Sequence, residues 1–402
     1  MSRRDDLPPH RFAKRFHDAL QRVLLLERRI DPFFRPVVDA LLREPAAAVT
    51  QLLINLRRRD DPLGIAEERR LPDEDAFLEA IVADMGDYLR AEYAGRTFER
   101  GGNTKTHGVV RGEFIIRNDV PMELRHGVFA ECRRFRAWVR FAGPGPASPP
   151  DIDDVGVLSI GVKLMGVPGS KLLDDERFTQ DFTGISTPTF TTPDVRENAK
   201  LQAAIRRGTP LFYFIGPRES HLLDAVMQGL WARTQTSPLE TRYWSCVPYL
   251  LGDGRAMQYS IRPRWATRST VPRLPRRPPD DYLRQAMVRT LERGDVELDV
   301  LVQVQTDARR MPIENASVRW SERRSPPVPV ATLLLPRQRF DSAAQLAFAH
   351  RLSFNPWHCV PEHRPLGNQN RARRRIYQDL SRLRQTMNGT PHREPTGDEV
   401  FD

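Results

Sequence analysis

The sequence predicts an α+β protein in which an antiparallel β-sheet or barrel is flanked by helices. Apolar residues in the first hundred positions recur at helical spacing, whereas from about Gly108 they alternate with a period of two. Few helical patterns interrupt the alternating region. This favours neighbouring antiparallel strands over strands joined by helical crossovers.

The helical region comes first and is assigned to residues 1–94. The apolar residues that carry its spacing are Phe12, Phe16, Leu20, Val23 and Leu24, followed beyond Pro36 by Val37, Val38, Leu41 and Leu42. Proline punctuates both segments. We therefore expect an arm of helices rather than a compact bundle.

The alternating region is assigned to residues 95–336, as a barrel with inserted helices. In the first expected strand, Val110, Gly112, Phe114 and Ile116 alternate with other residues. Further strands are expected at 137–141, at 157–164, around Met257, Tyr259 and Ile261, and at 297–305. Helical patterns interrupt it at 220–235 and 280–294, and proline-rich stretches at 143–150 and 263–279 indicate surface loops. Residues 337–402 form the third part, with helices expected at 342–352 and 370–385.

Composition limits the class of protein. The 402 residues carry 62 lysines and arginines against 52 acidic residues, a net charge of +10 that is spread along the chain. This distribution favours an anionic ligand or a merely arginine-rich protein over a nucleic-acid-binding one. Three cysteines without a CxxC pair argue against a disulfide framework or a zinc site and suit a reducing cytoplasm. Neither a secretory signal nor a membrane span is expected.

The most distinctive pattern lies in the last predicted helix. Arg373 and Tyr377 are four residues apart and therefore share a helical face, which Arg384 also shares two turns further on. A neighbouring arginine favours the anionic form of a phenol, and a ferric ion favours it more strongly. Taken alone, an RxxxY pair more often marks a basic helix with one packed tyrosine.

This helix resembles the proximal helix of the catalase family. Arg373, Tyr377, Arg382 and Arg384 match four positions of that helix, and the preceding Asn355-Pro-Trp-His and His363-Arg-Pro-Leu-Gly look like the shorter, catalase-related branch. The resemblance implies a catalase-like antiparallel β-barrel with an N-terminal helical arm and C-terminal helices. It also implies haem b as cofactor, with Tyr377 as axial ligand of the ferric iron, Arg373 beside it and Arg384 at a propionate.

His107 is the candidate on the opposite, distal side of the haem. Heterolytic cleavage of a peroxide O–O bond needs a base that takes a proton from one oxygen and delivers it to the other. His107 opens the first clear strand, and the glycines after it would allow a flat ligand to approach closely. A lone histidine at a strand edge is usually a packing residue, so the assignment rests on the resemblance to the distal histidine of catalases.

Two further segments resemble haem-contacting strands of the family. Trp138-Val-Arg-Phe141 is similar to the strand whose arginine reaches a haem propionate, which implies that role for Arg140. The segment from Asp181 to Phe190 is similar to the strand that carries a distal asparagine and then a phenylalanine on the porphyrin. Phe190 would take the second of these roles.

The sequence departs from the family around His107. Ser186 falls where the distal asparagine is usual, and a hydroxyl cannot reproduce the reach of an amide. Ala142 replaces a supporting serine. Thr106 precedes His107, as in the allene-oxide-synthase-like branch, and its hydroxyl would hold the imidazole by a hydrogen bond. Thr104 replaces a propionate-binding arginine, for which Arg96, Arg100 or Lys105 would have to substitute.

These observations predict a haem-dependent enzyme that acts on a small peroxide. The substrate is hydrogen peroxide or an organic or fatty-acid hydroperoxide, and the reaction is of peroxidase, catalase or hydroperoxide-rearranging type. His107 is the acid/base, with Thr106 and Ser186 beside it. A non-enzymatic haem-binding protein and an arginine-rich nucleic-acid-binding protein are the alternatives. A homo-oligomer is left open as a partner.

Overall fold

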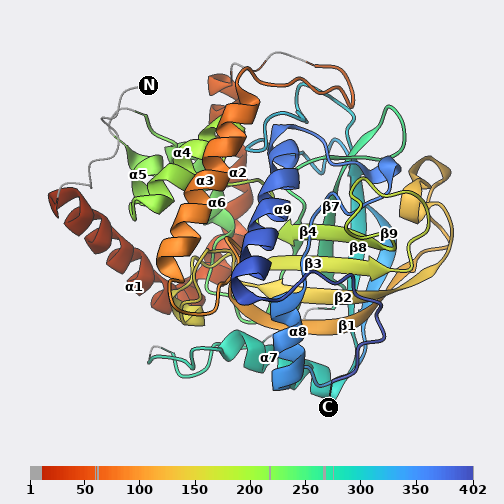
Figure 1. The fold of residues 1–402 in the computed structure, drawn as a ribbon. Helices are drawn as coiled ribbons and strands as arrows, with labels where there is room; N and C mark the ends of the chain where they lie inside the picture. The colour runs from red at the N-terminus through yellow and green to blue at the C-terminus, as the bar shows by residue number, and fades with distance from the viewer. Residues whose placement is uncertain are drawn as a thin grey trace.

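The computed structural model describes residues 11–58, 60, 63–216, 219–265, 269–274 and 276–401. Its centre is an antiparallel β-barrel (Figure 1). Strands pair in the order β5–β4–β3–β2–β1–β9–β8–β7, and β5 pairs again with β7, which closes eight strands into a barrel, while β6 pairs with β7 outside the ring. The strands are β1 Thr106–Ile116, β2 Arg134–Ala142, β3 Ser159–Met165, β4 Thr179–Ile185, β5 Tyr243–Trp244, β6 Tyr249–Leu250, β7 Ala256–Pro263, β8 Val296–Val304 and β9 Val328–Leu335.

Alternating apolar side chains of these strands fill the main core. Phe114 of β1 stacks on Phe182 of β4 with ring centroids 5.5 Å apart, and Phe129 from the β1–β2 connection packs against both. The short strand β5 closes the barrel, pairing with β4 at Ile185 and with β7 at Ser260 and Ile261.

Helices connect the strands and gather on the left of the barrel and, as α7 and α8, below it in the view of Figure 1. Three helices precede β1, three lie between β4 and β5, one lies between β7 and β8, and two follow β9. They are α1 Arg11–Leu41, α2 Arg43–Arg57, α3 Glu74–Glu92, α4 Val195–Arg206, α5 Leu211–Ile215, α6 Leu222–Trp231, α7 Tyr282–Arg293, α8 Ala343–Arg351 and α9 Asn368–Asn388.

A second apolar core joins the N-terminal and C-terminal helices. Ile81 and Leu89 of α3 pack with Ile376 and Leu380 of α9 and with Val195 of α4. Figure 1 shows α3 and α9 beside each other, at the left ends of the strands. The helix that carries Tyr377 is thus fixed by packing on α3, far away in the sequence.

The predicted α+β class and the antiparallel barrel are confirmed. The helical patterns at 220–235, 280–294, 342–352 and 370–385 correspond to α6, α7, α8 and α9. Helix α4 was not predicted, although Asp194 caps it by accepting a hydrogen bond from the Glu197 amide.

The arm differs from its expectation in one respect, because α1 continues without a break through Pro32 and Pro36. The division of the chain at residues 94 and 336 stays a prediction. Within the described ranges, no helix is both long enough and apolar enough to cross a membrane.

Candidate functional site

His107 lies on a β-bulge at one rim of the barrel. Thr106 pairs with Ala142 and Gly108 pairs with Phe141, so that His107 is an extra residue on β1 with no partner on β2. A bulge bends a strand locally and redirects a side chain out of the regular alternation. The backbone of β1 therefore gives His107 an orientation that an unbroken strand would not.

The same rim collects residues from four strands. Thr106, Ala142, Ser159 and Ile185 are paired in one row across β1, β2, β3 and β4. Ser186 follows Ile185 directly. The strand register thus brings the predicted distal residues of β1 and of the end of β4 to one end of the barrel.

His107 is buried in surroundings that favour its neutral form. It is 1% exposed, and among the described residues neither ring nitrogen has a hydrogen-bond partner. Burial and the positive charges of Lys105, Arg284 and Arg140 hold the pKa of His107 well below its usual range. A neutral imidazole with unpaired nitrogens can accept a proton, and such buried unpaired groups usually signal a missing partner.

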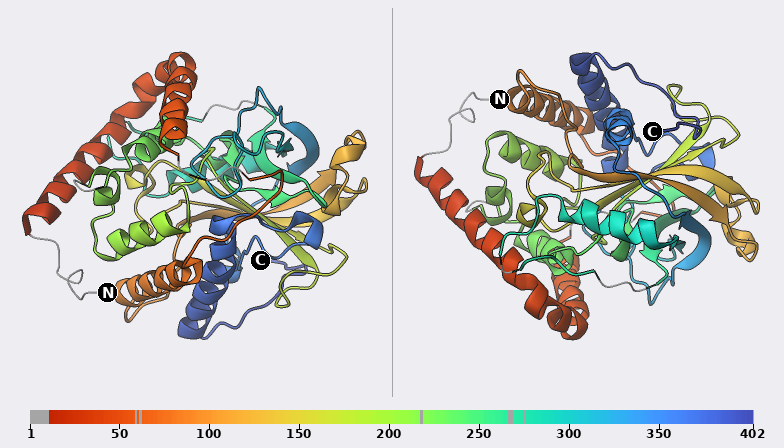
Figure 2. Two further views of the ribbon diagram at one scale, coloured as in Figure 1. Left: turned by 90° about the horizontal axis from the view of Figure 1, so that it is seen from above. Right: turned by 90° about the horizontal axis from the view of Figure 1, so that it is seen from below.

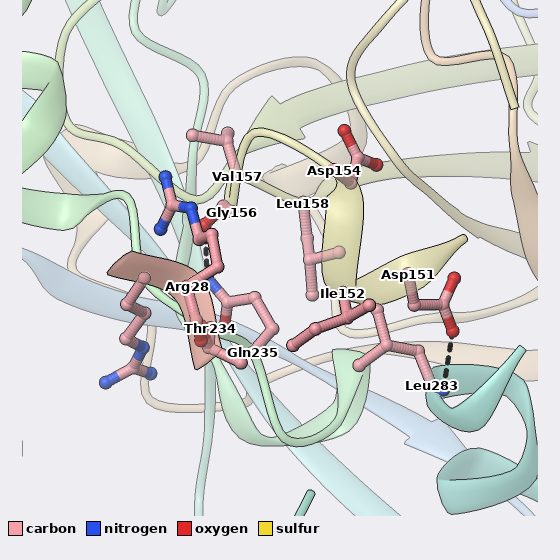
Figure 3. A pocket seen from close by; sticks show the side chains of 11 residues that line it. Arg28, Asp151, Ile152, Asp154, Gly156, Val157, Leu158, Thr234, Gln235 and Leu283 are labelled. Carbon is pink, nitrogen blue, oxygen red and sulfur yellow. Dashed lines mark hydrogen bonds between the residues drawn. The ribbon is translucent and has the colours of Figure 1, made fainter. Parts of the chain in front are cut away.

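Asp151 is the nearest acidic group to this imidazole. Its Oδ1 lies 3.6 Å from His107 Nδ1, too far for a hydrogen bond, and 2.6 Å from Lys105 Nζ. Its Oδ2 accepts a hydrogen bond of 2.8 Å from the Leu283 amide at the start of α7. Figure 3 shows this bond, with Asp151 held between its own short helical turn and α7. The sequence did not predict Asp151 as a site residue.

Two expectations about the neighbours of His107 are not met. The Thr106 hydroxyl accepts hydrogen bonds of 2.6 and 3.2 Å from Arg140, and it does not hold the imidazole. At Gly108 the close approach is made by the Phe340 ring, which would lie 2.4 Å from a Cβ at that position. The glycine therefore makes room for a phenylalanine of this chain.

Three arginines form a cluster beside this rim: Arg140 and Arg384 are buried, and Arg100 is half-buried. Arg140 donates to the carbonyl oxygens of Asn103 (2.8 Å) and Thr104 (3.1 Å), just before His107 in the chain. Arg384 of α9 and Arg100 both donate to the carbonyl oxygens of His350 and Leu352 at the end of α8. Of the three residues suggested to substitute for a propionate-binding arginine at position 104, Arg100 belongs to this cluster. Arg96 pairs with Glu92 and Lys105 pairs with Asp151, so these two do not belong to it.

The charge of this cluster is poorly compensated. Burial and the other two guanidinium groups lower the pKa of Arg100 well below its usual range. Burial and Arg384 lower the pKa of Arg140 to about 9, and burial lowers that of Arg384 to about 10. Glu99 is the one carboxylate of the described chain whose charge opposes all three shifts. The cluster is suited to an anion with more than one carboxylate.

The predicted pair on α9 is in contact. Arg373 Nη2 donates to the Tyr377 phenol oxygen at 3.1 Å and to Thr183 Oγ1 at 2.6 Å, and Nη1 donates to Asn370 Oδ1 at 3.0 Å. Burial opposes the charge of Arg373, but the phenol oxygens of Tyr377 and Tyr249 outweigh it and raise the pKa of Arg373 above its usual range. A permanent positive charge therefore faces the Tyr377 oxygen.

The remaining predicted residues have less distinctive surroundings. Ser186 is buried, and its Oγ accepts a hydrogen bond of 2.9 Å from the Leu158 amide, which leaves the hydroxyl proton free to donate. Phe190 is partly buried against the main core. Arg382 is exposed, so of the two later arginines of the motif only Arg384 points into the protein.

A buried ion cluster holds the segment that leads to α9. Lys163 Nζ donates to Glu176 and, at 2.8 Å, to Asp181, while His358 Nδ1 lies 3.0 Å from Asp181 and Nε2 lies 3.0 Å from Asp175. Glu176, Asp181 and His358 are close enough together to bind a metal, but the ammonium group of Lys163 already contacts both carboxylates. We interpret the cluster as structural.

The cluster makes stability depend on pH. Burial and Lys163 lower the pKa of His358, but hydrogen bonds with Asp175 and Asp181 and the charge of Glu176 outweigh them and raise it to about 9. The stabilisation is complete below pH 6.5 and is lost as the pH rises to about 9. His358→Gln should therefore lower the free energy of unfolding by about 1 to 3 kcal/mol at pH 6. Urea unfolding should show this deficit shrinking by pH 9, and a constant deficit would contradict the assignment.

Solved structures with the same architecture are catalases. The chain matches a fungal catalase at 16% identity with a TM-score of 0.59, covering 86% of this chain and 70% of that one. The chain has the catalase fold. Catalase A from Saccharomyces cerevisiae (17% identity, TM-score 0.60) and a bacterial catalase (17%, 0.54) match over 86% of this chain and 72% and 70% of theirs. No family model and no curated protein matches the sequence.

The residues of this catalase fold suit a haem. A haem carries two propionates, and the arginine cluster offers three guanidinium groups with little counter-charge. Arg100 Nη1 and both nitrogens of His107 are buried without partners in the described chain. Tyr377, beside a charged Arg373, supplies an oxygen of the type that ligates iron in catalases. A group of cations with little counter-charge, a buried imidazole and a phenol oxygen are thus all present in the described chain.

Proposed function

We propose that this chain binds haem b between His107 and Tyr377 and acts on a peroxide there. The arginine cluster carries the proposal because it connects the two sides. Arg140 is bonded to the segment that ends in His107, and Arg384 lies seven residues after Tyr377 on α9. Arg384 and Arg100 donate to the same two carbonyl oxygens, those of His350 and Leu352, which supports a common anion site. Anionic groups bound there would lie near both His107 and Tyr377.

The arginines would hold the propionates, and Tyr377 would ligate the iron. Arg373 would donate its hydrogen bond to the ligating phenol oxygen, and the oxygen acceptors around its guanidinium outweigh burial and keep it positively charged. When bound, haem would supply a ferric centre that can give two electrons to one peroxide and recover them from a second.

His107 would move the proton. As a neutral base it accepts the proton from one peroxide oxygen and delivers it to the other, which then leaves as water or an alcohol. Burial and the charges of Lys105, Arg284 and Arg140 lower the pKa of His107 and would favour the neutral imidazole before each turnover. Asp151, 3.6 Å from Nδ1, would favour the imidazolium that forms transiently.

The proposed substrates are hydrogen peroxide and organic hydroperoxides, including those of fatty acids. Ser186 and Ala142 leave the distal side without an amide or a supporting hydroxyl, which would weaken the orientation of hydrogen peroxide. A threonine directly before the distal histidine, as Thr106 is here, is also found in the shorter, hydroperoxide-rearranging branch that the sequence resembles. Because its hydroxyl is bonded to Arg140, we assign it to the propionate side and not to the imidazole.

Haem loading and substrate comparison test the proposal. The purified chain should take up one ferric haem and show a Soret band, and failure to do so would refute the proposal. The loaded protein is then assayed for oxygen release from hydrogen peroxide and for conversion of a fatty-acid hydroperoxide. Haem uptake without turnover of either substrate would favour a non-enzymatic haem-binding protein, an alternative supported by the loss of the distal amide at Ser186.

Arg384→Gln tests the anion site. Loss of one charge-assisted pair, about 1.5 to 3 kcal/mol, should weaken haem binding by about 10- to 100-fold. The matched control is Arg382→Gln, an exposed arginine two residues away on the same helix. Titration of apo-protein with haem should show the loss in the first variant alone. Equal affinities would exclude Arg384 as an anchor.

Asp151→Asn tests how the imidazole is supported. Asparagine can still accept the hydrogen bond from the Leu283 amide, so α7 should remain capped. Without the carboxylate, the positive charge of Lys105 disfavours the imidazolium, and kcat/KM for the peroxide should fall by about tenfold. Asp153→Asn, on the same helical turn, is the control and should retain wild-type activity.

A further inference from the structure

Acidic and imidazole side chains gather where α4 meets the connection between α5 and α6. Glu197 lies on α4, Glu219 lies in the connection, and His221 directly precedes α6. One ligand atom of each lies within 4.8 Å of those of the other two. The three helices, drawn in shades of green, lie between α1 and α3 in both views of Figure 2. The cluster is therefore separate from the proposed haem site.

The spacing of these side chains is close to that of a metal site. His221 Nε2 lies 3.1 Å from Glu197 Oε2. Two atoms bound to one tetrahedral Zn²⁺ lie about 3.4 Å apart. Because the three ligand atoms lie within 4.8 Å of one another, movements of about 1 Å would give all of them this spacing. The Glu219 side chain is 57% exposed and therefore free to make such a movement.

The His221 ring is supported on its other side. Asp224 Oδ2 lies 3.6 Å from Nδ1, a gap that a small rotation would close to a hydrogen bond. A metal-binding histidine usually donates its second N–H to a carboxylate or a carbonyl oxygen, which fixes the tautomer. The Tyr213 ring also stacks on His221, with ring centroids 4.2 Å and planes 3° apart. These two contacts orient the imidazole with Nε2 toward Glu197.

Positive charge is scarce around this cluster. The Lys200 ammonium contacts two of its carboxylates, at 2.9 Å from Glu197 Oε1 and 2.7 Å from Glu219 Oε2. With Asp224, three carboxylates thus surround one ammonium and one imidazole. The Tyr213 hydroxyl is buried and has no hydrogen-bond partner in the described ranges of the chain. Burial and the charges of Glu197 and Asp224 raise the pKa of this phenol above its usual range, so it is a neutral donor without an acceptor.

We propose that His221, Glu197 and Glu219 bind a divalent transition-metal ion such as Zn²⁺, which replaces the Lys200 ammonium. One imidazole nitrogen with two carboxylates suits Zn²⁺, whereas Mg²⁺ and Ca²⁺ prefer oxygen ligands alone. Lys200 is 42% exposed and can turn into solvent, unlike the fully buried Lys163 of the ion cluster described above. The ion would join α4 to the start of α6. This inference is independent of haem binding and of the proposed reaction.

Isothermal titration calorimetry of the chelator-treated full chain with Zn²⁺ tests the site. Wild type should bind one Zn²⁺ per chain, and excess Mg²⁺ should not compete. His221→Gln should weaken binding by more than about 100-fold, since losing even an outer partner of a metal ligand costs about 10- to 100-fold. The matched control is His126→Gln, a partly exposed histidine that approaches Arg255 and should keep wild-type affinity. Circular dichroism verifies that the variants fold.

Two surface variants decide the question if His221→Gln does not fold. Glu219→Gln should weaken Zn²⁺ binding by at least about tenfold. Lys200→Gln should strengthen it by about fivefold, because breaking exposed ion pairs of a competing cation has about that effect. A gain of affinity on losing Lys200 is not expected of a purely structural ion pair.

Four results would overturn the inference. They are a wild-type chain that binds no Zn²⁺, an unchanged affinity in His221→Gln, a Lys200→Gln chain that binds Zn²⁺ no more tightly than wild type, and binding that is lost in His358→Gln but kept in His221→Gln. The last result would place the ion in the buried cluster around Lys163.

Discussion

Tyr377→Phe should abolish stable haem binding while the protein remains folded. Phenylalanine keeps the ring that packs against the core of α3, α4 and α9 and removes the oxygen alone. Arg373 keeps its bonds to Thr183, Tyr249 and Asn370, so the buried guanidinium does not lose all its partners. Loss of the only proposed protein ligand to the iron should weaken haem binding by at least about 100-fold, or about 2.7 kcal/mol.

The control for this variant is Tyr88→Phe, which removes a phenol oxygen from the same apolar core without touching Arg373. Haem titration followed by the Soret band measures both variants. Tyr88→Phe should bind haem as wild type does. A Tyr377→Phe protein with wild-type affinity and an unchanged spectrum would exclude Tyr377 as the ligand, even if haem were bound elsewhere.

The features that the sequence predicted best lie within single elements. Arg373 and Tyr377 are one turn apart on one helix, so their contact follows from helical geometry. The long strands β1, β7 and β8 were found because their apolar residues alternate without interruption. In these cases local geometry determines the arrangement, whatever the rest of the chain does.

The features that the sequence did not predict arise from distant segments. Asp151 meets His107 because the 143–150 loop, read as a surface excursion, returns to the start of β1 and is held there by α7. Gly108 was interpreted as room for a ligand, but the space is filled by Phe340 from beyond the last strand. No residue spacing within one element encodes either contact.

The arginine cluster was predicted in part. Arg140 and Arg384 were predicted from resemblance, and the structure adds Arg100 because its guanidinium shares the α8 carbonyl oxygens with Arg384. Arg96 and Lys105 were equally good candidates by sequence position. What distinguishes Arg100 is a buried Nη1 that has no hydrogen-bond partner in the described chain, a property of the folded chain alone.

His107→Gln should separate catalysis from haem binding. Glutamine fits the bulge and keeps a polar side chain there, but it cannot accept and return a proton at neutral pH. Loss of a general acid/base typically costs 10²- to 10⁴-fold, so kcat/KM for the preferred peroxide should fall by about that factor. Haem affinity should stay within about threefold of wild type, because the proposed anchors are Tyr377 and the arginine cluster.

The pH profile gives a second readout of the same residue. The pKa of His107 is held well below 6.5 by burial and by three positive charges, so the imidazole of the wild type remains a base down to about pH 6. Wild-type kcat/KM should therefore not decline between pH 8 and about pH 6 through protonation of this histidine. A decline centred near 6.5 that His107→Gln removes would show that the imidazole is protonated in that range and that its buried, cation-lined surroundings do not persist in the working enzyme. Full activity of His107→Gln would transfer the proton-moving role to another group at this rim of the barrel, of which Asp151 is the nearest acid.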